Sequence, residues 1–142
     1  MKRIIATAFF ALATLVAGTA VAQNHAVKAN VPFDFTVGNA HIPAGTYLIS
    51  ETNSQNTVEI RNAAGKPAIF GSVYSDGKHS QTSKLVFDRY GDRYFLREIL
   101  CANAGMNLEL PVSKTEKSVQ RQMASVQSEN SQQVYIALNE IK

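Results

Sequence analysis

With 142 residues, 45% of them hydrophobic and 18% charged, the chain has room for one domain with a modest core and not for two domains of ordinary size. Its single cysteine, Cys101, excludes a disulfide within the chain. Lysine and arginine alternate with aspartate and glutamate along the sequence, whereas nucleic-acid-binding proteins usually carry a clustered basic face, so we expect no nucleic-acid partner.

Residues 1–22 have the three parts of a secretory signal peptide. Met1-Lys2-Arg3 is a positively charged start, an apolar run extends from Ile4 to Val16, and Ala20-Val21-Ala22 is a small-x-small cleavage site. Cleavage near Ala22 would leave 12 basic and 11 acidic residues, so the net charge would fall from +3 to about +1. No later stretch is apolar for the roughly 18 residues that a membrane helix needs. We therefore expect a protein secreted to the periplasm or outside the cell, with no transmembrane segment in the mature chain.

The mature chain is expected to begin with a flexible lead, residues 23–30, followed by a single β-rich domain, residues 31–142. Val31 to Val37 alternates apolar and polar positions, which is typical of a half-buried strand. Further runs of β-branched and aromatic residues between turn signals predict strands over 46–50, 57–61 and 68–74.

The clearest supersecondary signal is a hairpin over residues 84–100. Gly91-Asp92 at its centre suits a tight two-residue turn. The register that follows places Phe87 opposite Leu96, Arg89 opposite Tyr94, and Leu85 opposite Glu98. Glu98 would then lie on the apolar face, as a buried acid or in an ion pair with Arg89. A three-residue loop would shift the pairing by one residue.

The period of the pattern changes near the C-terminus. Val119, Met123 and Val126 recur at helical spacing, and Ser113 and Glu116 have the spacing of a capping box, which predicts a helix over 113–128. Alternation over 134–139 predicts a last strand. These elements predict a mainly β fold, either a small antiparallel β-sandwich or a partly open β-barrel, with one C-terminal α-helix followed by a final strand.

Four segments carry a resemblance to known proteins: VPFDFTVG at 31–38, IPAGTY at 42–47, LVFDRYGDRYFL at 85–96, and residues 110–114. Together they resemble a family of small, secreted, functionally uncharacterised bacterial proteins, and the likeness covers most of the mature chain. The resemblance implies a shared secreted β-rich domain and brings no activity or site residues. The turn at 42–47 is also similar to one in transthyretin-like β-sandwich modules of secreted proteins.

One candidate ligand-binding surface is the tip of the hairpin. Tyr90, Arg93 and Tyr94 are of the residue types favoured at recognition hot spots, so they would suit a sugar or a protein partner. The alternative is that these aromatic rings pack in the core or against a neighbouring strand.

A candidate metal site would arise at the new N-terminus, where cleavage exposes Gln23, Asn24 and His25. The free amine, two backbone amides and the imidazole would enclose Cu(II) or Ni(II) in a square plane. Cyclisation of Gln23 would remove the amine. His41, His79 and Asp76 have no recognised ligand spacing. Cys101 lacks a neighbouring histidine in the sequence, and an unpaired cysteine is commonly a small buried hydrophobe. The alternative is a disulfide that joins two chains.

No nucleophile–base pair or cofactor motif can be assembled from these residues. The leading hypothesis is therefore a secreted, non-enzymatic cell-envelope protein that needs no cofactor and binds an envelope protein or glycan. The alternative is a structural or stress-related envelope protein without a discrete ligand. A copper-binding protein that uses its N-terminus, or an enzyme of unrecognised type, ranks third.

Overall fold

The computed structural model describes residues 26–52, 56–65, 69–75, 80–126 and 131–140. The predicted signal peptide and the predicted metal ligands Gln23, Asn24 and His25 lie outside the described residues, as do Asp76 and His79.

The described residues form eleven β-strands and one α-helix. In chain order these are β1 (Ala26–Val31), β2 (Phe35–Val37), β3 (Ala40–Ile42), β4 (Gly45–Glu51), β5 (Thr57–Asn62), β6 (Ile69–Ser72), β7 (Tyr74–Ser75), β8 (Lys84–Tyr90), β9 (Arg93–Cys101), β10 (Met106–Glu109), α1 (Lys114–Ser125) and β11 (Gln132–Glu140). The mainly β fold with one helix and a final strand is confirmed.

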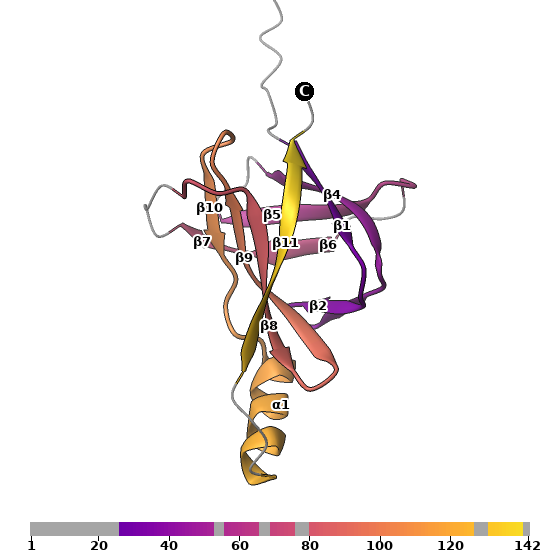
Figure 1. Ribbon diagram of the computed structural model, residues 1–142, viewed down its shortest axis with the longest axis vertical. Coiled ribbons are helices and arrows are strands. Elements are labelled where there is room, and N and C mark those ends of the chain that lie inside the picture. The colour runs from indigo at the N-terminus through magenta and orange to yellow at the C-terminus, as the bar shows by residue number, and fades with distance from the viewer. Residues whose placement is uncertain (1–25, 53–55, 66–68, 76–79, 127–130, 141–142) are drawn as a thin grey trace, which may run out of the picture.

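All the strands belong to one hydrogen-bonded sheet in the order β3-β2-β9-β8-β11-β1-β4-β5-β6, and β10 pairs with both β7 and β9. The pairings are antiparallel except that of β2 with β9, which is parallel and joins Thr36 to Phe95. The sheet curls into a partly open barrel, and α1 projects from one end of it (Figure 1). Of the two predicted architectures, the partly open β-barrel is the one that forms.

The core lies inside the curled sheet and is built by alternation along its strands. Val27, Ala29 and Val31 of β1 are all buried, and Phe35 packs edge-to-face against both Tyr47 and Phe87. Cys101 is also buried here, which confirms that it packs as a small hydrophobe. Because β1 hydrogen-bonds to β4 on one side and β11 on the other, the end of the domain is tied directly to its beginning.

The predicted flexible lead is wrong from Ala26 onward, because residues 26–30 belong to β1. The predicted strand 31–37 is also divided: β1 ends at Val31 and β2 begins at Phe35. Pro32 lies in the break, and proline has no backbone N–H to donate to a strand ladder. Phe33 follows it and packs against the core.

The β8–β9 hairpin has the predicted register near its turn, with Phe87 opposite Leu96 and Arg89 opposite Tyr94. Beyond that point a β-bulge adds Arg97 to β9, so that Val86 lies opposite Glu98 and Leu85 lies opposite Ile99. The predicted pairing of Leu85 with Glu98 is therefore wrong.

The bulge has a clear physical reason. Side chains alternate along a strand, so Leu96 and Ile99, three residues apart, can both face the core only if one extra residue is inserted between them. Cys101 then faces the core as well. Glu98 is consequently turned off the core face. Among the described residues it forms no ion pair with Arg89, whose Nε donates to the Gly91 carbonyl instead, at 2.8 Å.

The predicted helix forms as α1, with Ser113 as its N-cap. Ser113 Oγ accepts the Glu116 N–H at 3.1 Å, and the Ser113 backbone hydrogen-bonds in return to the Glu116 carboxyl, which completes the capping box. Residues 127 and 128 of the prediction lie outside the described residues. No helix in the described part of the chain is long and apolar enough to span a membrane.

Candidate functional site

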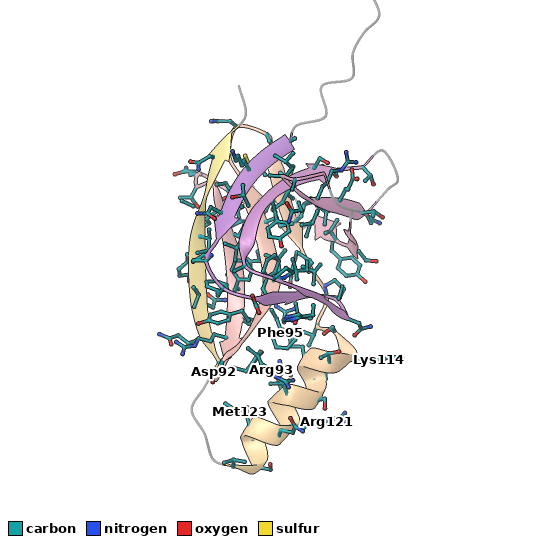
Figure 2. All side chains as sticks on the ribbon, turned by 90° about the vertical axis from the view of Figure 1, so that its right-hand side faces the viewer. Asp92, Arg93, Phe95, Lys114, Arg121 and Met123 are labelled. Carbon is teal, nitrogen blue, oxygen red and sulfur yellow. The ribbon has the colours of Figure 1, made fainter. Side chains whose placement is uncertain are left out.

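A cleft of about 420 Å³ opens between the β2–β3 hairpin, the start of β9 and the first turn of α1. We call it the hairpin cleft. It is lined by Asp34, Phe35, Thr36, Asn39, His41, Asp92, Arg93, Tyr94, Phe95 and Thr115. Figure 2 shows Asp92, Arg93 and Phe95 at the end of the barrel from which α1 projects.

The cleft exists because β2 runs beside the first half of β9, while the second half of β9 pairs with β10. The chain then reverses at Gly38, whose φ of 59° is a conformation that favours glycine, and returns as β3. The Thr115 hydroxyl donates to Asn39 Oδ1 at 3.1 Å and ties α1 to this turn. Three segments far apart in the sequence thus form the walls.

Asp34 is the most constrained acid of the cleft. Its Oδ1 accepts the Ala44 N–H at 2.8 Å, and its Oδ2 lies 3.7 Å from His41 Nε2, with both side chains largely exposed. Burial and, to a smaller extent, the charge of Asp34 raise the pKa of Tyr47, whose hydroxyl donates to the Pro43 carbonyl. Asp34 therefore presents a fixed, solvent-facing carboxylate to the cleft.

The three residues predicted at the hairpin tip do not lie on one surface. Arg93 and Tyr94 both line the hairpin cleft. The Tyr94 ring also stacks on Phe33, with ring centroids 3.9 Å apart, so part of its surface is used in packing. Tyr90 lies opposite Arg93 in the register and so shares its face of the hairpin, but its hydroxyl meets α1 rather than lining the cleft.

Tyr90 belongs to a group of polar side chains beneath α1, which we call the helix-docking cluster: Asp88, Tyr90, Arg97, Glu116 and Gln120. The Tyr90 hydroxyl donates to Glu116 Oε1 at 3.3 Å and accepts from Gln120 Nε2 at 2.7 Å. Its ring lies edge-to-face against Phe95. The alternative role given to the hairpin aromatics, packing against neighbouring elements, therefore describes Tyr90.

Arg97 is the centre of this cluster and uses all three of its nitrogens. Nε donates to Asp88 Oδ2 at 2.9 Å, Nη1 to the Leu110 carbonyl at 2.9 Å, and Nη2 to Glu116 Oε1. Its own carbonyl accepts the Leu110 N–H at 2.7 Å. Because Arg97 is the bulged residue, its side chain is aimed at α1 rather than along the sheet.

The cluster perturbs the protonation of its members. Burial raises the pKa of the Glu116 carboxyl, and the charge of Arg97 only partly opposes this effect. Burial alone would lower the pKa of Arg97, but its hydrogen bond to Asp88 and the charges of Glu116 and Asp88 raise it. Every described buried side-chain polar atom has a hydrogen-bond partner, so the cluster leaves no such group free for a ligand. We therefore infer that its role is structural and that it holds α1 on the sheet.

Metal binding finds no support within the described residues, where no group of three or more His, Cys, Asp or Glu side chains could hold an ion. His41 lies in the hairpin cleft beside Asp34, not in a ligand set. Most of the cleft residues were not singled out from the sequence, because the parallel pairing of β2 with β9 leaves no local signal. No family model, curated protein or solved structure matches the chain.

Proposed function

We propose that the chain is a secreted, non-enzymatic binding module of the cell envelope and that its hairpin cleft holds an envelope glycan. The resemblance of residues 31–38 and 85–96 to small secreted bacterial proteins supports the location. The observation that carries the proposal is the composition of the cleft walls, in which hydrogen-bonding side chains from three segments converge on one open space.

The chemistry of the cleft suits a ligand rich in hydroxyl groups. The carboxylates of Asp34 and Asp92 accept hydrogen bonds, the guanidinium of Arg93 donates them, and Thr36 and Asn39 do both. Sugar hydroxyls donate and accept in the same way. The volume of about 420 Å³ falls within the usual range for small-ligand sites, about 300–1,000 Å³.

A second cleft of about 430 Å³ lies between the β2–β3 turn and β6. Its walls are mainly apolar and small, with Val37, Ala40, Gly71 and Leu110 among them. It offers few side-chain donors or acceptors to orient a glycan, which is why the hairpin cleft is the better candidate.

The test is a thermal-shift titration of residues 23–142 with peptidoglycan fragments and other envelope oligosaccharides. A ligand that binds only the folded protein adds about 2.7 kcal/mol to the unfolding free energy at about 100 times its dissociation constant. We expect a rise in melting temperature that Arg93→Ala and Asp92→Asn abolish. Arg61→Ala is the matched control, because Arg61 is exposed on β5, where it pairs with Glu59.

Two outcomes would count against the proposal. A shift that survives both cleft variants would place the ligand elsewhere on the protein. No shift with any oligosaccharide would favour the alternative, a structural or stress-related envelope protein without a discrete ligand.

A further inference from the structure

The charged residues of α1 are divided between its two faces. The helix carries one acid, Glu116, and three bases, Lys114, Lys117 and Arg121. Glu116 is turned inward, only 2% exposed, and is bound to Arg97 and Tyr90, whereas all three basic residues are exposed. The charged residues on the solvent-facing side of α1 are therefore all cationic.

The three bases form a row, which we call the basic stripe. Their spacing of three and four residues places them within roughly 60° of the helix circumference and spreads them over about 10 Å of its length. The buried residues Val119 and Glu116 lie on the opposite side. Within the described part of the chain, no member of the basic stripe has an ion-pair partner.

Helix stability does not explain this arrangement. Lys114 and Lys117 lie near the N-terminus of α1, where the helix dipole disfavours positive charge. With the mature chain expected near neutrality, three exposed cations on one projecting helix are also a local concentration of positive charge. A partner of opposite charge would account for both features.

The shape of the region indicates what kind of partner fits. The far end of α1 extends beyond the barrel, and Lys114 and Arg121 lie on this projecting helix (Figures 1 and 2). An exposed helix is convex and matches an extended, flat surface better than it encloses a small ligand. The apolar side of α1 faces away from the basic stripe: Val119 is buried, Met123 reaches towards the hairpin turn at Gly91, and the exposed C-cap residue Val126 follows on the same side. Contact through the basic stripe would therefore be electrostatic and without insertion of the helix.

From the charge, exposure and shape of this surface we propose that the basic stripe docks the protein onto the surface of an anionic lipid bilayer. Each lysine or arginine near such a surface strengthens binding about fivefold, and the attraction falls off within a Debye length. Binding is thus weak and sensitive to salt. It is independent of the glycan proposed for the hairpin cleft.

The test is co-sedimentation of residues 23–142 with vesicles of phosphatidylcholine containing about 30% phosphatidylglycerol, compared with phosphatidylcholine alone. We expect binding to the anionic vesicles only, lost as salt is raised from about 0.05 M to about 0.5 M. Lys117→Gln/Arg121→Gln should weaken the partition about 25-fold, from two factors of about five. Lys28→Gln/Arg61→Gln removes the same charge from exposed positions on β1 and β5 and should weaken it much less.

Equal losses in the two double variants would overturn the proposal, because binding would then follow net charge alone. Equal binding to neutral vesicles would overturn it as well. Binding to soluble dextran sulfate without binding to anionic vesicles would replace the bilayer with an anionic polysaccharide. Thermal unfolding of each variant separates a loss of docking from a loss of fold.

Discussion

Arg97 is the residue on which the attachment of α1 depends. Its three nitrogens donate to Asp88, to the Leu110 carbonyl and to Glu116, and its side chain is only 12% exposed. A lysine could not reproduce this forked set of donors. The two carboxylates that it bridges are also shielded, at 15% exposure for Asp88 and 3% for Glu116.

Arg97→Met is expected to lower the free energy of unfolding by about 3–5 kcal/mol, because it leaves the carboxylates of Asp88 and Glu116 shielded and uncompensated. Arg61→Met is the control, since its exposed pair with Glu59 should contribute about 0–1 kcal/mol. Urea unfolding followed by circular dichroism measures both. Equal effects would mean that the helix-docking cluster contributes no more than a surface ion pair.

Glu116 gives the protein a definite pH dependence. Because burial raises its pKa above the ordinary value of 4.5, the folded state holds this proton more tightly than the unfolded chain does. The stabilisation that comes from the protonated Glu116 carboxyl is therefore fully present below pH 4.5. It is lost as the pH rises through the pKa of Glu116 in the folded state.

Glu116→Gln removes this titration while keeping the shape of the side chain. We expect the variant to gain stability relative to the original protein as pH increases across that range, and the difference to be constant below it. Unfolding free energies measured from acidic to neutral pH provide the comparison. A difference that moves in the original protein's favour with rising pH would show that attraction to Arg97, rather than burial, controls the carboxyl group.

Among the secondary-structure elements, the sequence predicted correctly those features that depend on residues close together in the chain. The turn at Gly91-Asp92 and the capping box at Ser113 and Glu116 depend on neighbouring residues, and both were predicted correctly. The bulge at Arg97 was missed because a single extra residue leaves the surrounding alternation almost unchanged. β3 and β10 were missed because strands of three and four residues are too short to establish a period.

Strands β2 and β6 are not hydrogen-bonded to each other, but they lie close together at Gly71 of β6. A Cβ atom there would lie 3.2 Å from Val37 Cγ1 of β2 and 3.5 Å from Leu110 Cδ2. The backbone of β6 thus packs directly against the side chains on the other border of the second cleft. Because glycine has no side chain, the backbone of β6 can approach β2 closely at this position.

Gly71→Ala is expected to cost about 1–3 kcal/mol through overpacking. The cost should be smaller in a Val37→Ala background, which removes the nearest methyl group, so a double-mutant cycle on unfolding free energies measures the contact directly. Gly45→Ala is the control, since its Cβ would meet only ordinary contacts with Tyr47, the nearest at 3.6 Å. Strictly additive effects of Gly71→Ala and Val37→Ala would contradict this packing.

Across the whole protein, the hairpin cleft and α1 lie at the same end of the partly open barrel, because Thr115 of α1 lines the cleft. The interior of the barrel is filled by side chains. The sequence pointed to Arg93 and Tyr94 but not to Asp34, Asn39 or Thr115. These residues come together only through the long-range pairing of β2 with β9 and the docking of α1, neither of which has a local signature. We therefore propose that ligand recognition takes place at this end of the barrel.

The most direct measurement is the amide NMR spectrum of residues 23–142 during titration with a peptidoglycan fragment. If the fragment binds in the hairpin cleft, chemical-shift changes will concentrate at Thr36, Asn39, Arg93 and Thr115, while Lys28 and Tyr135 stay unchanged. Changes centred on another surface, or no changes at saturating ligand, would rule out binding in the hairpin cleft.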